Sequence, residues 1–233
     1  MFNRLKFLIS MNSPVKLFFS YFKTYVFYKI YKSKILNHNE EWRRFLNEKK
    51  ITVDWFSFKS FFFYLTLKNL KKFSYLEIGC FEGNSFLYVM SNFHPEIAYA
   101  VDTWKGSDEH QNSEHDLEKV EKNFDFNLLD FSENFIKIKN NSKFFFKENK
   151  FFFDIIYVDG SHSYIDVLND LEESWKILNL NGVLICDDYF FSYYKEKKKL
   201  PANAINAFIN KNNQKCKITY FTKHQIFIKK IKN

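Results

Sequence analysis

Three carboxylates and one histidine occupy positions from which they could act together. Asp159 follows an apolar run at residues 153–158, and Asp187 and Asp188 follow another at residues 182–186. If both runs are parallel strands, their carboxyl ends meet at one edge of a sheet. Carboxylates about 4 Å apart repel by about 4 kcal/mol at an effective dielectric of 20, so a divalent cation such as Mg²⁺ is expected to bind all three. In the alternative, Asp187 and Asp188 point to opposite faces and bind no metal.

His162 lies three residues beyond Asp159, in a Gly-Ser-His turn. An imidazole with an ordinary pKa of about 6.5 suits a general base that removes a hydroxyl proton. A loop histidine is usually only solvated, but the adjacent carboxylate favours a catalytic role. Other candidates near this edge are the pocket-lining tyrosines Tyr164 and Tyr189 and a lid at residues 106–116 with His110 and His115, where a solvated loop is the alternative.

A glycine turn with acidic neighbours lies between residues 75 and 85. Gly79 and Gly83 allow close backbone approach and positive φ angles, and Ser85 is expected to cap the next helix. Asp102, roughly twenty residues further on, is placed to accept hydrogen bonds from ribose hydroxyls. The glycines do not follow GxGxxG, so a pyrophosphate-binding turn is disfavoured. The candidate cofactor contacts at this edge are Glu77, Gly79, Gly83, Ser85, Asp102 and Asp159.

An alternation of short apolar runs and longer amphipathic segments supplies the elements that would position these residues. The first five runs are separated by helix-length connections, which is typical of a parallel sheet with right-handed crossovers. The last two are too close together for a crossover and predict an antiparallel hairpin. The predicted strands are residues 74–78, 97–101, 135–138, 153–158, 182–186, 215–221 and 224–230.

The first 51 residues are predicted to form a basic, aromatic helical extension to a single α/β domain over residues 52–233. One or two helices are expected within residues 1–36. A polar arc of Lys16, Ser20, Lys23 and Thr24 suits a helix that lies on a membrane surface or on another subunit, while packing on its own domain is the alternative. A further helix is predicted to begin at Glu40-Glu41, and another to end at residues 68–72.

Composition bounds the class of protein. A chain of 233 residues with 46% hydrophobic content can bury one sizeable core. The net charge of +8 comes almost entirely from residues 1–39, which lack Asp and Glu, so the domain itself is nearly neutral and no nucleic-acid partner is expected. Three cysteines without CxxC spacing fit a reducing compartment. No apolar run reaches the roughly 18 residues of a membrane span, so we expect a cytoplasmic protein, with membrane contact or homo-oligomerisation confined to the N-terminal helices.

Four segments together resemble a known family. LEIGCFEGNS at residues 76–85 resembles motif I of class I methyltransferases that use S-adenosylmethionine (SAM). With VDTWKGSDEH (101–110), DIIYVDGSHSY (154–164) and GVLICDDY (182–189), the chain resembles methyltransferase family 24. That family is similar to macrolide-sugar O-methyltransferases and, more distantly, to metal-dependent catechol-type enzymes. The resemblance covers about residues 52–230 and leaves the extension unexplained.

The resemblance implies a fold, a cofactor and a reaction. The fold would be a Rossmann-like three-layer sandwich with a seven-stranded sheet ordered 3-2-1-4-5-7-6, its last strand antiparallel. SAM would bind at the glycine turn, with Glu77 near the methionine end and Asn141 and Ser142 against the adenine. His162 would be the base, Mg²⁺ would bind at the three aspartates, and the acceptor would be a hydroxyl of a sugar or another small polar metabolite.

Two other functions share part of this pattern. An NAD-dependent oxidoreductase would have the same strands and an acidic residue at Asp102, but the missing GxGxxG disfavours it. A domain that binds SAM without turnover would not need the reacting edge, yet the edge is complete: Asp159, His162, Asp187 and Asp188 are all present.

Overall fold

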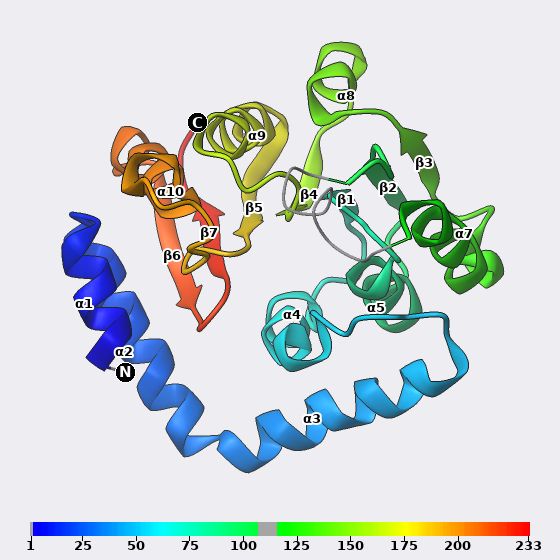
Figure 1. Ribbon diagram of the computed structural model, residues 1–233, viewed down its shortest axis with the longest axis horizontal. Helices are drawn as coiled ribbons and strands as arrows, with labels where there is room; N and C mark the ends of the chain where they lie inside the picture. Colours follow the sequence, from blue (N-terminus) through cyan, green and yellow to red (C-terminus); the bar gives the residue numbers. More distant parts are fainter. Residues whose placement is uncertain (1, 107–115) are drawn as a thin grey trace.

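The computed structural model describes residues 2–106 and 116–233, so His110 and His115 lie outside the described residues. Seven strands form one sheet in the order β3-β2-β1-β4-β5-β7-β6 (Figure 1). Strands β1 to β5 run parallel, and β7 is antiparallel to both of its neighbours, β5 and β6. This confirms the predicted fold class and hairpin. The strands are β1 (Ser74–Ile78), β2 (Ile97–Asp102), β3 (Ile136–Lys139), β4 (Phe153–Val158), β5 (Leu178–Cys186), β6 (Cys216–Phe221) and β7 (Ile226–Lys230).

Two strands begin more than one residue away from their predicted starts. Strand β5 starts at Leu178 rather than at residue 182, and its pairing with β4 shifts register between Phe153 and Ile155. Asn181 has a φ of +69° within this irregular stretch, so its polar residues do not follow strand alternation. Strand β7 starts at Ile226 because residues 222–225 form the hairpin turn, which the Thr222 N to Gln225 O hydrogen bond closes.

Helices cover both faces of the sheet and divide its core in two (Figure 1). Side chains alternate along each strand, so Leu76 and Ile78 pack on the face covered by α8, α9 and α10, whereas Tyr75 packs on the face covered by α4, α5 and α7. The helices are α4 (Ser60–Leu67), α5 (Asn84–Phe93), α7 (Leu117–Asn127), α8 (Ser142–Glu148), α9 (Tyr164–Ile177) and α10 (Pro201–Lys211), with short 3₁₀ turns η1 (Leu46–Glu48), η2 (Ser57–Lys59), η3 (Leu129–Phe131) and η4 (Lys197–Lys199).

The N-terminal helices α1 (Phe2–Ser10), α2 (Val15–Ile30) and α3 (Lys32–Phe45) wrap around the β6 edge and one face (Figure 1). Leu17 and Tyr21 of α2 belong to the same core as β6 and β7, and Thr24 Oγ1 accepts a hydrogen bond from Phe221 N at 3.0 Å. On the other face, Trp42 Nε1 of α3 donates to Asn84 Oδ1 of α5 at 2.9 Å. Residues before 52 therefore contribute to both cores, and the boundary at residues 51 and 52 stays a prediction.

Two predictions for this segment were wrong. Glu40 and Glu41 lie inside α3, which begins at Lys32, because Glu40 pairs with arginines one turn later instead of opening the helix. The expected polar arc of α2 is not its outer face, since Thr24 is buried and Lys16 reaches Cys216 Sγ. Within the described residues, none of the helices combines the length and apolarity that a membrane span requires.

Candidate active site

The turn after β1 can only be built with glycine at position 79. Gly79 has a φ of +87°, and a Cβ at this position would lie 2.1 Å from the carbonyl oxygen of Asp159 at the end of β4. Gly79 N donates to Val101 O of β2 at 2.9 Å, so the turn is held between two neighbouring strands. The close approach of the β1 and β4 ends brings the glycine turn directly beside Asp159.

Gly83 has a packing role, and its predicted contact with a cofactor stays a prediction. Gly83 is the N-cap residue of helix α5 and has a φ of +82°. A Cβ there would lie 2.7 Å from the Leu128 side chain and 2.9 Å from the Phe124 side chain. These two side chains belong to α7 and the turn that follows it. Gly83 therefore allows α5 and α7 to pack closely.

Glu77 and Ser85 bind each other inside the protein. Ser85 Oγ donates to Glu77 Oε1 at 2.5 Å, and the Tyr75 hydroxyl donates to Glu77 Oε2 at 2.5 Å. The predicted helix cap at Ser85 was wrong, because Gly83 holds the N-cap position and α5 begins at Asn84. Burial raises the pKa of Glu77 to about 8, so a protonated carboxyl fits this apolar position. The fully buried Glu77 supports the glycine turn from within.

The Asp102 side chain holds the same turn by binding backbone N–H groups of the turn. Its carboxylate accepts hydrogen bonds from Cys80 N at 2.8 Å, Phe81 N at 2.9 Å and Trp104 N at 2.7 Å. Burial raises the pKa of Asp102, and these backbone donors act in the opposite direction.

A cavity of about 400 Å³, here called the cofactor cavity, opens over this turn. Of the predicted cofactor contacts, five line this cavity (Gly79, Asp102, Asn141, Ser142 and Asp159), whereas Glu77, Gly83 and Ser85 do not. Asn141 caps α8 by accepting from Phe144 N at 2.8 Å, which fixes the loop after β3 at the cavity wall.

Two further carboxylates in the cofactor cavity were missed. Asp170 accepts from Ser142 Oγ at 2.6 Å, and Asp166, in the first turn of α9, pairs with Lys143 at 3.1 Å. Burial raises the pKa of Asp170 to about 6. The sequence signal was weak because both residues lie in the first turns of a helix, where acidic residues are common for reasons of capping. Asp102, Asp166 and Asp170 together give the cavity an acidic lining.

A second cavity of about 560 Å³, here called the acceptor cavity, adjoins the first. The two share Gly79, Phe81, Asp159 and Gly160, so a group held in one can touch a group held in the other. Aromatic side chains dominate the remaining wall, with polar groups at one end. Its lining includes Trp55, Phe56, Phe58, Lys59, His162, Asp188, Phe191, Tyr193 and His224.

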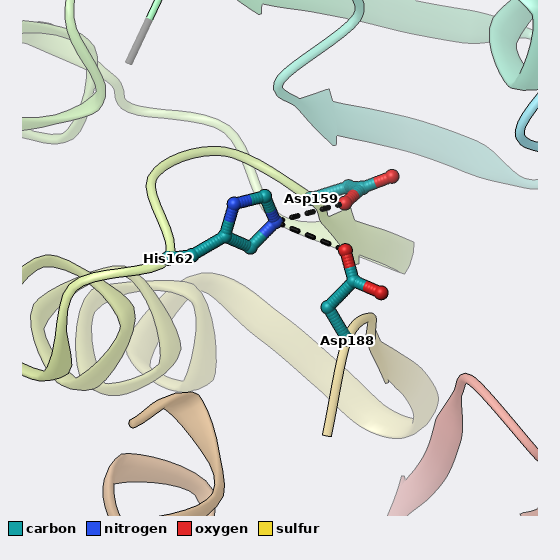
Figure 2. Close-up of side chains that lie close together, drawn as sticks. All are labelled: Asp159, His162 and Asp188. Atoms are coloured by element: carbon teal, nitrogen blue, oxygen red, sulfur yellow. Dashed lines mark ion pairs between the residues drawn. The ribbon is translucent and has the colours of Figure 1, made fainter. Parts of the chain in front are cut away.

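Asp159, His162 and Asp188 converge at the polar end of the acceptor cavity (Figure 2). His162 Nε2 lies 3.0 Å from Asp188 Oδ2 and 3.8 Å from Asp159 Oδ1. The imidazole packs against the Phe191 ring with a centroid separation of 4.4 Å. Asp188 has a φ of +54°, a conformation that Asp tolerates better than most residues and that turns the chain sharply after β5. One ligand atom from each of the three lies within 4.8 Å of the others, a spacing compatible with a metal ion.

The structure separates Asp187 from this cluster, contrary to the predicted ligand set. Asp187 continues the strand alternation of Ile185 and points to the α4 face, where Lys59 Nζ lies 2.5 Å from its Oδ2. The Tyr157 hydroxyl contacts Asp187 and lies 2.7 Å from Asp159 Oδ2, and Gln225 Nε2 donates to Asp187 at 3.2 Å. Neighbouring carboxylates raise the pKa of Lys59 even though its burial acts against the charged form. The expected neutralising charge at Asp187 is therefore an ammonium group supplied by the chain.

Sequence reasoning missed Lys59 and Tyr157, which connect this buried pair to Asp159. Lys59 interrupts the aromatic run from Phe56 to Phe63, and a lone lysine in such a run requires an acidic partner when it is buried. Tyr157 precedes Asp159 by two residues on β4, so both side chains point to the same face. Both residues could be recognised in the sequence, but the sequence did not show that each contacts Asp187.

The two tyrosines proposed as pocket residues lie elsewhere. Tyr189 is fully buried and is hydrogen-bonded to Ser13 at 2.7 Å and Asn206 at 2.8 Å, so it joins α1 and α2 to α10. Tyr164 begins α9 and packs against the core of that face.

A third cavity of about 280 Å³ lies under α2 and is called the α2 cavity here. Tyr21, Tyr25 and Tyr28 form one wall. Phe58, Lys59 and His224 line both this cavity and the acceptor cavity. The rings of Phe58 and His224 touch at a centroid distance of 4.7 Å, so they form a partition between the two spaces.

Comparison with solved structures agrees with the sheet order and helix layers. An O-methyltransferase from Bacillus cereus, solved in complex with SAH, superposes with a TM-score of 0.54 at 12% identity, covering 92% of this chain and 99% of that one. An rRNA methylase from Streptococcus thermophilus gives a TM-score of 0.54 at 11% identity, covering 78% and 100%. The chain has the Rossmann-like fold of class I methyltransferases. Because these two neighbours are described with different acceptors, the fold alone does not select one.

Sequence comparison points in the same direction. Residues 76–189 match a family model described as "Methyltransferase domain". A protein of Acanthamoeba polyphaga mimivirus, Uncharacterized protein R132, is 28% identical over 124 residues, which make up 50% of this chain and 51% of that protein. The chain thus aligns with about half the length of this curated relative.

Proposed function

We propose that the protein transfers the methyl group of SAM to a hydroxyl of a small polar metabolite, with a sugar as the expected acceptor. The observation that carries the proposal is the junction of two cavities at Gly79, Phe81, Asp159 and Gly160. The methyl donor would occupy the cofactor cavity and the hydroxyl would approach from the acceptor cavity. The match of residues 76–189 to a methyltransferase family model supports the reaction class.

The acidic lining of the cofactor cavity favours SAM over a dinucleotide. Asp102, Asp166 and Asp170 present carboxyl groups to this space, and the one basic side chain among its described lining residues, Lys143, is paired with Asp166. A pyrophosphate would meet these carboxylates with like charge, whereas a cationic sulfonium carries no phosphate. Asp102 suits the ribose hydroxyls, and Asn141 and Ser142 suit the adenine. When bound, SAM supplies an activated methyl carbon.

His162 is the proposed general base. In a methyl transfer from bound SAM to a hydroxyl, the imidazole of His162 would take up the hydroxyl proton. The imidazolium that results is stabilised by Asp188 at 3.0 Å and Asp159 at 3.8 Å. Phe191 holds the ring plane, which leaves little freedom for the base to reorient.

A divalent cation is a second candidate for the same place, favoured by the convergence of Asp159, His162 and Asp188. A set of two carboxylates and one imidazole fits a divalent ion, and Mn²⁺ accepts this mixture more readily than Mg²⁺, which prefers oxygen ligands. Such an ion would lower the pKa of a bound hydroxyl. Turnover measured in excess chelator separates the two ideas, because a base without metal keeps its activity whereas a metal-dependent enzyme loses it.

The acceptor cavity suits a ring with apolar faces and polar edges. Trp55, Phe81 and Tyr193 provide aromatic surfaces, while His162 and Asp188 provide hydrogen-bonding groups at one end. A sugar ring has C–H faces and hydroxyl edges, and this combination matches the wall. The preference for a sugar rests on this match and on the family resemblance.

Calorimetric titration with SAM and separately with NADH tests the cofactor. We expect binding of SAM and none of NADH; the reverse result would contradict the proposal. Methyl transfer from labelled SAM to a panel of sugars and sugar nucleotides then tests the reaction. Binding of SAM without transfer to any hydroxyl compound would instead support a non-catalytic SAM-binding domain.

A further inference from the structure

Helix α2 exposes an apolar face that the fold does not use. Val15, Phe19, Phe22, Val26 and Ile30 follow one another at intervals of three or four residues and share one side of the helix. Their side chains are 69%, 73%, 56%, 39% and 70% exposed. The opposite side, with Leu17, Tyr21 and Thr24, is buried against the sheet edge. A contiguous exposed apolar surface often marks an interaction site, whereas apolar residues scattered singly over a surface do not.

The adjoining helix α1 extends the exposed apolar surface. Phe2 and Ile9 are seven residues apart, so they lie on one side of the helix, and they are 74% and 65% exposed. Leu8 of the same helix is fully buried, which fixes which side faces the protein. The two helices together present seven large apolar side chains to the outside.

The charged side chains of α1 and α2 are all basic. Lys23 lies beside Phe22, Lys29 lies beside Ile30, and residues 1–39 contain no Asp or Glu. Five lysines of the three N-terminal helices are exposed: Lys6, Lys23, Lys29, Lys32 and Lys34. Aromatic residues flanked by exposed lysines are the composition of helices that lie in the interface of an anionic membrane.

A second copy of the chain is a poorer partner for this surface. A symmetric pair would bring two faces of the same composition together, with lysines on both and no carboxylate in residues 1–39 to pair with them. Anionic lipid head groups supply the missing negative charge and the acyl region accepts the aromatic rings. We propose that α2, with α1, docks the protein on an anionic lipid surface, with Phe19 and Phe22 inserted and the lysines at the head groups.

Co-sedimentation with vesicles tests the docking surface in the full chain. Wild-type protein is incubated with phosphatidylcholine vesicles or with vesicles that contain about one third phosphatidylserine, at low and high salt. We expect at least about tenfold stronger binding to the anionic vesicles, weakened by salt. Phe19→Ser/Phe22→Ser should reduce that binding by about tenfold or more, and Lys23→Gln/Lys29→Gln should weaken it and reduce the salt dependence.

Leu129→Ser/Leu180→Ser is the matched control, because these residues are 65% and 50% exposed and lie far along the chain from α2. It should bind vesicles like the wild type. Unchanged vesicle binding by Phe19→Ser/Phe22→Ser would overturn the proposal. So would a wild-type dimer in sedimentation equilibrium that ignores vesicles and dissociates in this variant, since the face would then belong to a second copy.

Discussion

At the scale of single residues, the buried Lys59–Asp187 ion pair is expected to stabilise the carboxyl ends of the strands at the candidate site. Both side chains are almost completely buried, with 6% and 1% exposure. Removing one charge of a buried pair leaves the other uncompensated. Lys59→Met should therefore destabilise the fold by about 3 to 5 kcal/mol in denaturant unfolding. Lys59→Met/Asp187→Asn should recover much of the loss; equal instability of the single and double variants would show that the pairing is not the cause.

His162 is tested by separating catalysis from cofactor affinity. The proposed base would contact the acceptor and not SAM, so His162→Ala should lower kcat by about 10²- to 10⁴-fold and leave the Kd for SAM within about twofold. His94→Gln, which changes an exposed histidine that lines neither cavity, serves as the control and should retain most of the turnover rate. Wild-type kcat in His162→Ala would remove the proposed base.

Glu77 makes stability depend on pH. Its pKa rises from an ordinary 4.5 to about 8 in the folded protein because it is buried. Between these values the folded chain holds a proton that the unfolded chain has lost, so the free energy of unfolding falls as pH rises from 4.5 to about 8, by an amount on the order of a few kcal/mol. Glu77→Gln should flatten that slope in denaturation curves measured across this range. An unchanged slope would assign the dependence to another group.

Candidate site residues could be predicted from the sequence where they directly follow a predicted strand. They could not be predicted where only tertiary packing brings them together. Asp159 and Asp188 follow apolar runs, and His162 follows Asp159, so their convergence was predictable. Lys59 comes from a different part of the chain, a turn before the first strand, and only the folded chain brings it to Asp187. Because Asp187 pairs with Lys59, it lies apart from Asp159, His162 and Asp188, with which it was predicted to bind a metal.

At the scale of elements, the close contact between the ends of β1 and β4 is what joins the two cavities. A Cβ at Gly79 would lie 2.1 Å from backbone, whereas a Cβ at Gly160 would meet its nearest atom at an ordinary 3.5 Å. Gly79→Ala should therefore lower the melting temperature strongly or prevent folding, and Gly160→Ala should fold nearly as the wild type. Thermal melts followed by circular dichroism compare the two. Equal melting of both variants would mean that the strand ends can separate at no cost.

Element type was predictable from periodicity, while bounds depended on features that periodicity does not encode. β1 and β4 match their predicted bounds because each is a continuous buried run. The start of β5 was missed because its first residues are polar and irregular around Asn181. The start of α3 was missed because charged residues on an exposed helix resemble a helix terminus.

At the scale of the whole molecule, the N-terminal helices are part of the two cores rather than a separate body. Leu8 and Leu17 pack with β6 and β7, and Trp42 packs with α5. We therefore expect one cooperative unfolding transition in calorimetry, with the calorimetric and van't Hoff enthalpies equal. Two resolved transitions, one of them lost on removal of residues 1–31, would show that the extension unfolds independently.

The partition made by Phe58 and His224 also bears on how acceptor preference can diverge among descendants of this protein. It stands between the acceptor cavity and the α2 cavity, and neither ring belongs to the glycine turn or to the strand ends that carry the proposed reaction. A mutation to a smaller side chain at Phe58 would merge the two spaces and admit a bulkier molecule without altering the methyl-transfer groups. Under the proposed function, substitutions at Phe58 would change which acceptors fit without changing the residues proposed for methyl transfer. Phe58 precedes the first strand of the sheet in the sequence.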